Sequence, residues 1–155
     1  MNVAPILKGG IRIDIESIND WLLFDLMILD TTSKKHSITD TICEKLKDNE
    51  DWNEFVVPDL NEHFNDQVGR VKKQLREERS KCSDSGEIHI NKENGADWYG
   101  TLNQARIQLE KQFSLHDLNE DDLETECTVE QRTAYLRGRF FTFLQQMIMD
   151  EGLLF

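Results

Sequence analysis

The sequence predicts a mainly α protein, built as one compact, bundle-like domain of five helices with a small two-stranded β element. Two observations predict this fold class. Apolar residues recur at helical spacing over five segments. Period-two alternation, the pattern of strands, is confined to two short stretches. A chain of 155 residues fits a single domain, and we expect that domain to span residues 1–155.

The β element is expected first in the chain. Isoleucines alternate with polar residues over 11–15 and again over 87–90, and a Gly9-Gly10 pair marks a turn before the first stretch. The two stretches would pair as a small sheet, which needs helices packed on it to persist.

The first helix is expected over residues 18–31, and it contains the stretch WLLFDLMILD. Its apolar residues cover nearly the whole circumference, which predicts a central helix or one half of an oligomer interface. A homodimer therefore stays open as an alternative. Asp25 interrupts the apolar surface, and a buried carboxylate must be paired or neutral.

The next two helices are expected over residues 39–48 and 59–79. Ile38, Ile42 and Leu46 recur every four residues in the first of them. Pro58 opens the second, since proline is tolerated in a first helical turn. The apolar residues of the second fall within an arc of about 80°; they are Leu60, Phe64, Val68, Val71 and Leu75.

The last two helices are expected over residues 93–113 and 129–149. Thr128 followed by Gln131 is a capping-box pattern, which predicts where the final helix begins. The final helix is expected to present six apolar residues to the core: Val129, Leu136, Phe140, Phe143, Leu144 and Met147.

Polar residues at the edges of these helices suggest an internal network. Arg106, Arg132 and Arg139 lie where apolar faces end, and arginines there commonly bury their stems and pair with a carboxylate. Asp25 is the most isolated carboxylate, so we expect it to bridge to one of them. Asn103 joins the candidates on the fourth helix, and the expected role of the network is structural.

Charge is the strongest compositional signal. The formal net charge is −12, which argues against direct binding to a nucleic-acid backbone. Residues 116–131 carry seven acids and no lysine or arginine. Such a surface would keep the protein soluble or attract a basic protein or peptide. The candidate partner surface comprises Asp117, Glu120, Asp121, Asp122, Glu124 and Glu126.

The sequence gives no reason to expect a metal, a cofactor or a catalytic residue. The EF-hand-like run that starts at Asp117 has Asp122 where glycine is needed and Thr128 where glutamate is needed. Nucleophile motifs and phosphate-binding glycine loops are absent. Three cysteines without CxxC spacing suggest reduced thiols. With no signal peptide or apolar span in the sequence, we expect a cytoplasmic protein that does not enter a membrane.

The segment 98–109, WYGTLNQARIQL, and the closing FLQQ at 143–146 resemble an uncharacterised, mainly actinobacterial family of helical proteins, a domain of unknown function. The resemblance lies mostly in residues 93–148. It departs at Glu110, where the family usually has glycine. It implies a compact bacterial protein with no assigned activity. Some members are labelled transcriptional regulators, and others are encoded beside the adaptor of the Clp protease.

Three functional hypotheses follow. The first is a non-enzymatic interaction or regulatory protein whose acidic surface binds a basic partner, which the lack of catalytic motifs favours. The second is an enzyme with a site between helices, around Asp25, Asn103 and Arg106. The third is an acidic mimic of nucleic acid, which would need carboxylates in two strand-like rows.

Overall fold

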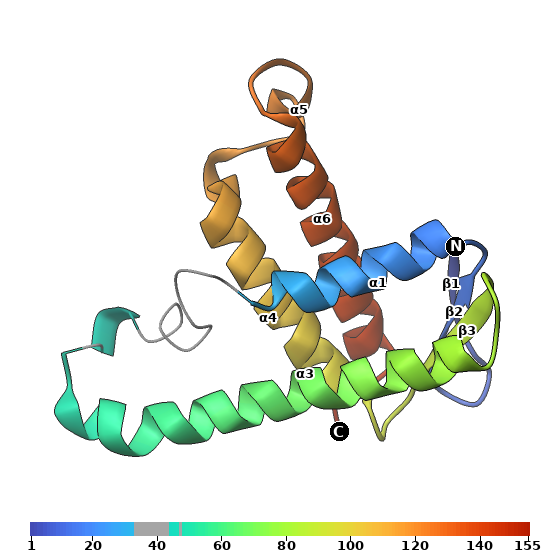
Figure 1. Ribbon diagram of the computed structural model, residues 1–155, viewed down its shortest axis with the longest axis horizontal. Coiled ribbons are helices and arrows are strands. Elements are labelled where there is room, and N and C mark those ends of the chain that lie inside the picture. The colour runs from blue at the N-terminus through green and yellow to red at the C-terminus, as the bar shows by residue number, and fades with distance from the viewer. Residues whose placement is uncertain (33–43, 47) are drawn as a thin grey trace.

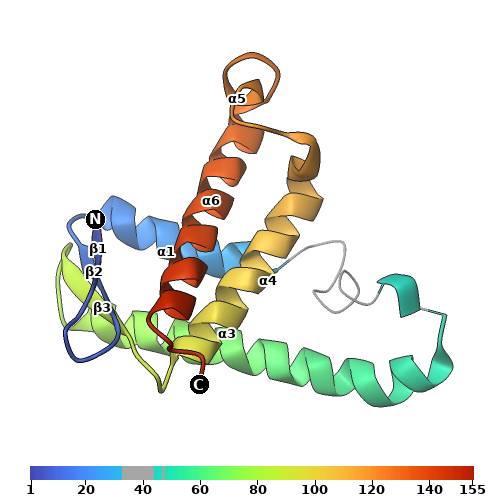
Figure 2. The same cartoon turned by 180° about the vertical axis from the view of Figure 1, so that it is seen from behind.

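The computed structural model describes residues 1–32, 44–46 and 48–155. Its described part is mainly helical, as expected, with a small sheet at one end (Figure 1). Helices α4 (Gly95–Phe113) and α6 (Val129–Asp150) lie side by side in both views (Figures 1 and 2). Helix α3 (Val57–Ser80) passes across one end of this pair, and α1 (Ile18–Asp30) crosses it.

The sheet has three antiparallel strands where the sequence suggested two. Strands β1 (Asn2–Pro5), β2 (Ile11–Ile15) and β3 (Gly86–Ile90) pair in the order β1-β2-β3. Ile13 lies opposite Ile88, so the expected pairing of β2 with β3 is confirmed. The β1–β2 turn uses Gly9 and Gly10 at φ of 81° and 132°, which glycine adopts without strain.

The remaining helical pieces are short. Most of the expected helix 39–48 lies outside the described residues; within it, Glu44–Leu46 forms a single 3-10 turn. A π-helical turn, Trp52–Val56, leads directly into α3, and Pro58 lies in the first turn of α3 as expected. The acidic connection contains a 3-10 turn, Leu115–Asp117, and the one-turn helix α5 (Asp122–Thr125), which the sequence did not predict.

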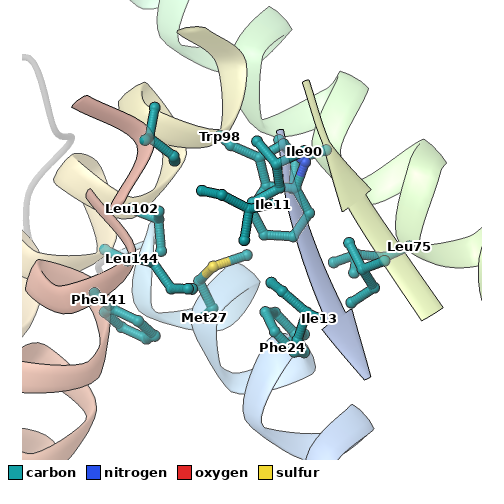
Figure 3. Close-up of a cluster of buried hydrophobic side chains, with 14 of the residues drawn as sticks. Ile11, Ile13, Phe24, Met27, Leu75, Ile90, Trp98, Leu102, Phe141 and Leu144 are labelled. Atoms are coloured by element: carbon teal, nitrogen blue, oxygen red, sulfur yellow. The ribbon is translucent and has the colours of Figure 1, made fainter. Parts of the chain in front are cut away.

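One core joins the sheet to all four long helices (Figure 3). The isoleucines of β2 and β3 face it from the sheet. Phe24 of α1 meets Trp98 of α4 edge to face, with ring centroids 5.9 Å apart. The largest of its fully buried side chains are Ile11, Ile13, Trp21, Phe24, Met27, Ile88, Ile90, Trp98, Leu102, Leu109, Phe141 and Leu144.

A single glutamine, Gln74, connects three elements around this core. Its Oε1 accepts hydrogen bonds from Trp98 Nε1 at 2.9 Å and from Asn94 Nδ2 at 3.0 Å. Its Nε2 donates to the backbone carbonyl of His89 at 2.8 Å. The amide of α3 therefore positions both the start of α4 and the edge of β3.

Helix α6 is rotated relative to the expectation from its sequence. The residues it buries are Ala134, Phe141, Leu144, Gln145 and Ile148. Three residues expected in the core, Val129, Leu136 and Phe143, are instead 72%, 55% and 49% exposed. They recur every seven residues and so form one apolar line along the outer side of the helix.

Candidate functional site

Asp25 is not a buried carboxylate. Its side chain is 51% exposed and faces α3, where its Oδ2 accepts a hydrogen bond from Arg79 at 2.9 Å. The expected bridge from Asp25 to Arg106, Arg132 or Arg139 is therefore wrong. Arg79 also stacks over the ring of Trp21 at 5.9 Å.

Helix α1 is accordingly peripheral and not central. Trp21, Phe24 and Met27 face the core. The outer side is apolar too: Ile18, Leu22, Leu26 and Leu29 are between 39% and 64% exposed. The apolar circumference seen in the sequence thus corresponds to one buried face and one exposed face.

The buried ion pair of this helix is made by Asp30, which sequence reasoning missed. Arg137 of α6 grips it with two hydrogen bonds, at 2.8 and 3.0 Å. The two side chains are only 9% and 16% exposed. Desolvation by burial raises the pKa of the Asp30 carboxyl, and the hydrogen bond and charge of Arg137 offset this only in part.

Asn103 and Arg106 do form a local pair on α4. The Asn103 side-chain oxygen accepts a hydrogen bond from Arg106 Nη2 at 3.1 Å. Arg106 Nε is buried and has no hydrogen-bond partner among the residues that the structure describes. Both Arg106 and Arg139 line a shallow pocket of about 120 Å³ between α4 and α6.

The other two arginine candidates do not pair with Asp25 either. Arg139 donates to Glu120 at 2.6 Å and lies over the Tyr135 ring. Arg132 is exposed, and among the described residues its guanidinium has no ion-pair partner. Asp25 lines a different pocket from Arg106, so the five polar candidates do not converge on one site.

The acidic partner surface lies together at one tip of the molecule. We call the six residues predicted for it the acidic cap. They occupy the connection around α5, at the end of α4 and α6 farthest from α3 (Figures 1 and 2). All but Asp122 are exposed. Two have basic neighbours: Glu120 pairs with Arg139 and Asp117 with His116.

The other four carboxylates of the acidic cap differ in their contacts. The side chains of Asp121, Glu124 and Glu126 form no ion pair within the described residues. Asp122 accepts a hydrogen bond from the backbone N–H of Asn119 at 2.9 Å, which shapes the turn. Beside the cap, α6 begins with exposed Val129.

The larger pocket lies between α1 and α3, with a volume of about 270 Å³. Its apolar lining comprises Trp21, Phe24, Ile28, Leu29 and Leu75. Its polar lining comprises Asp25, Lys72, Arg76 and Arg79. Three cations in a groove were not predicted as a site, because in the sequence they read as the solvated face of an amphipathic helix.

Neither a metal centre nor a membrane span is present in the part of the chain that the structure describes. There, no three histidine, cysteine or acidic residues cluster as ligands for a metal ion. None of the described helices combines the length and the apolar character needed to cross a bilayer.

Comparison with known proteins gives one result. Neither the curated proteins nor the solved structures include a match to the chain. A family profile, however, matches residues 44–151, from the 3-10 turn through α6. The matched region includes α4 and α6, which carry the resemblance noted in the sequence. It also includes α3. Because this match covers most of its length, the chain belongs to the family described as Domain of unknown function (DUF2017).

Proposed function

We propose that the protein is a cytoplasmic, non-enzymatic interaction protein that binds a basic segment of a regulatory partner through the acidic cap. The observation that carries the proposal is the concentration of exposed carboxylates there. Asp121, Glu124 and Glu126 form no ion pair within the described residues, so no salt bridge there offsets their charges. A basic segment would supply the missing cations.

The outer line of α6 supports a partner with apolar residues as well. Leu136 and Phe143 follow Val129 down the same side of the helix, starting at the acidic cap. Exposed apolar residues next to a charged rim are typical of protein-interaction surfaces. The expected occupant is therefore a peptide segment in which lysine or arginine residues accompany leucine-like residues.

The test uses a fluorescein-labelled 12-residue peptide of lysine, arginine and leucine, titrated with the protein and followed by anisotropy. We expect binding that weakens between about 50 and 300 mM NaCl, because salt screens exposed charges. The triple variant D121N/E124Q/E126Q should weaken binding, while a peptide with glutamate for each basic residue should not bind.

A matched control removes the same number of charges elsewhere. Glu50, Glu54 and Glu62 are exposed residues away from the acidic cap. The variant E50Q/E54Q/E62Q should retain binding. If it loses as much affinity as the cap variant, the attraction comes from net charge alone and the cap is not the binding surface.

A further inference from the structure

The groove between α1 and α3 has the opposite charge to the rest of the molecule. Lys72, Arg76 and Arg79 follow one another on α3 at spacings of four and three residues, so they share one rim of the groove. Asp25 is the single acid among the described residues of the lining, and Arg79 already pairs with it. Lys72 and Arg76 form no ion pair within the described residues.

The floor of the groove is apolar and aromatic. Trp21 and Phe24 contribute rings from α1, and Leu75 closes the groove from α3. The Asp25–Arg79 ion pair joins the two walls at 2.9 Å. These floor residues are almost fully buried, so an occupant would mainly contact the exposed Leu29 at the edge of the groove and the two rim cations that form no ion pair within the described residues.

The dimensions favour a segment of a protein over an enclosed small molecule. The volume of about 270 Å³ lies below the roughly 300–1,000 Å³ of pockets that enclose a drug-sized ligand. Leu29 lines the groove and is 64% exposed, and Leu22 and Leu26 continue the apolar surface outward along α1. A long, open apolar strip with a charged rim suits an amphipathic helix that inserts a few side chains.

We propose that this groove docks an acidic amphipathic helix of a partner protein, with its apolar face on the exposed leucines Leu22, Leu26 and Leu29 of α1 and its carboxylates on Lys72 and Arg76. Charge complementarity selects the partner, since this rim would repel the basic segment proposed for the acidic cap. The two surfaces are separate, so either can be correct without the other.

The probe is a labelled 18-residue helical peptide with leucines at positions i, i+3, i+4 and i+7 and glutamates at most other positions. We expect it to bind the wild-type protein, and we expect K72E/R76E to weaken it by about tenfold or more. The indole N–H signal of Trp21 in ¹⁵N-edited spectra should shift on binding, because Trp21 lines the groove.

Two controls keep the test specific. K73E/K81E makes the same change in net charge at two exposed lysines outside the groove, one on α3 and one directly after its last residue, and should change the affinity less than about twofold. A peptide of the same composition with its leucines scrambled should bind more weakly. The cap variant D121N/E124Q/E126Q should bind the probe as the wild type does.

Three results of the peptide titrations would overturn the proposal. The probe does not bind, K73E/K81E weakens it as much as K72E/R76E does, or the scrambled peptide binds equally well. Sedimentation of the protein alone tests a second copy as the occupant. Self-association that K72E/R76E abolishes would assign the groove to a homodimer and would exclude a partner helix.

Discussion

The two acids of the stretch WLLFDLMILD form ion pairs in different environments. Asp25 and Asp30 are five residues apart, so they point about 140° away from each other around α1. Asp25 meets α3 at the surface, and Asp30 meets Arg137 of α6 in the interior. The surface pair should contribute little stability, whereas the interior pair is sensitive to the loss of either partner.

The Asp30–Arg137 pair can be tested by a double-mutant cycle. Asp30→Leu should lower the free energy of unfolding by about 3–5 kcal/mol, because it leaves the Arg137 guanidinium buried without a counterion. Arg137→Met should also be destabilising, but the double variant should lose far less than the sum. Urea unfolding measures all four proteins, and strictly additive losses would show that the two charges do not interact.

The pH dependence of stability offers a second test at this residue. The pKa of Asp30 is raised above its ordinary 3.8, so the folded state binds this proton more tightly than the unfolded state. Its contribution to stability is therefore present in full below that value and is lost as pH rises through the raised pKa. The wild type minus Asp30→Asn difference in unfolding free energy should fall from about pH 4 upward. A difference that rises with pH would mean that Arg137 lowers this pKa.

The sequence could not assign these roles. In a helix that is apolar all round, the wheel gives no direction for the core, so the isolated Asp25 looked buried. The direction is decided by α3, α4 and α6, which pack on α1 from distant parts of the chain. Asp30 stands in the last helical turn, where a polar residue normally ends a helix at the surface.

Among the elements, α6 shows best which features can be predicted from the local sequence pattern. Its first residue was predicted from Thr128 and Gln131, and both reciprocal hydrogen bonds of the capping box are present at 3.1 Å. Gln131 also donates from Nε2 to the Phe113 carbonyl at 3.1 Å, which joins the start of α6 to the end of α4. Its buried face was predicted only in part. Leu144 is fully buried and Phe140 and Met147 are partly buried, but polar Gln145 and small Ala134 also line that face while Phe143 does not.

Thr128→Ala should therefore destabilise the protein by about 1 kcal/mol, because the backbone N–H of Gln131 loses its acceptor. Thr133 on the same helix is a matched control. Among the described residues its hydroxyl bonds only to carbonyls of the preceding turn, so Thr133→Ala should be nearly neutral. Thermal unfolding followed by circular dichroism compares the two, and equal losses would show that the cap contributes nothing specific.

Strand β1 was not predicted from the sequence. It has four residues and ends in Pro5, and proline usually argues against a strand. Its position at the edge of the sheet removes that objection, because an edge strand leaves some N–H groups unpaired. Such a position depends on the assembled sheet and cannot be seen locally.

At the scale of the whole molecule, the hydrophobic core includes residues that lie outside the region matched by the family profile. The match begins at residue 44, after β1, β2 and α1. Of these, β2 contributes Ile11 and Ile13 and α1 contributes Phe24 to the same buried cluster that contains Trp98 and Leu144 (Figure 3). The mainly helical class was predictable because periodicity alone determines it, whereas the closure of this core depends on contacts between both ends of the chain.

A fragment of residues 44–155 should consequently fail to fold cooperatively. Removing residues 1–43 would strip β3 of its only partner strand within the described residues and expose the core face of α4. We expect weak near-ultraviolet dichroism and no sharp urea transition, in contrast to the full chain. A cooperative transition in the fragment would show that the matched region is a domain by itself.

Gln74 gives the fold a chemical vulnerability of its own. The oxygen of its side-chain amide accepts two hydrogen bonds, and the nitrogen of the same amide donates to the His89 carbonyl. Deamidation to glutamate would keep the shape of the side chain and the link to Trp98, but it would direct a carboxylate oxygen at that carbonyl. Deamidation of this one side chain changes the mass very little. It would weaken the contact between the sheet and the helices while leaving each element intact.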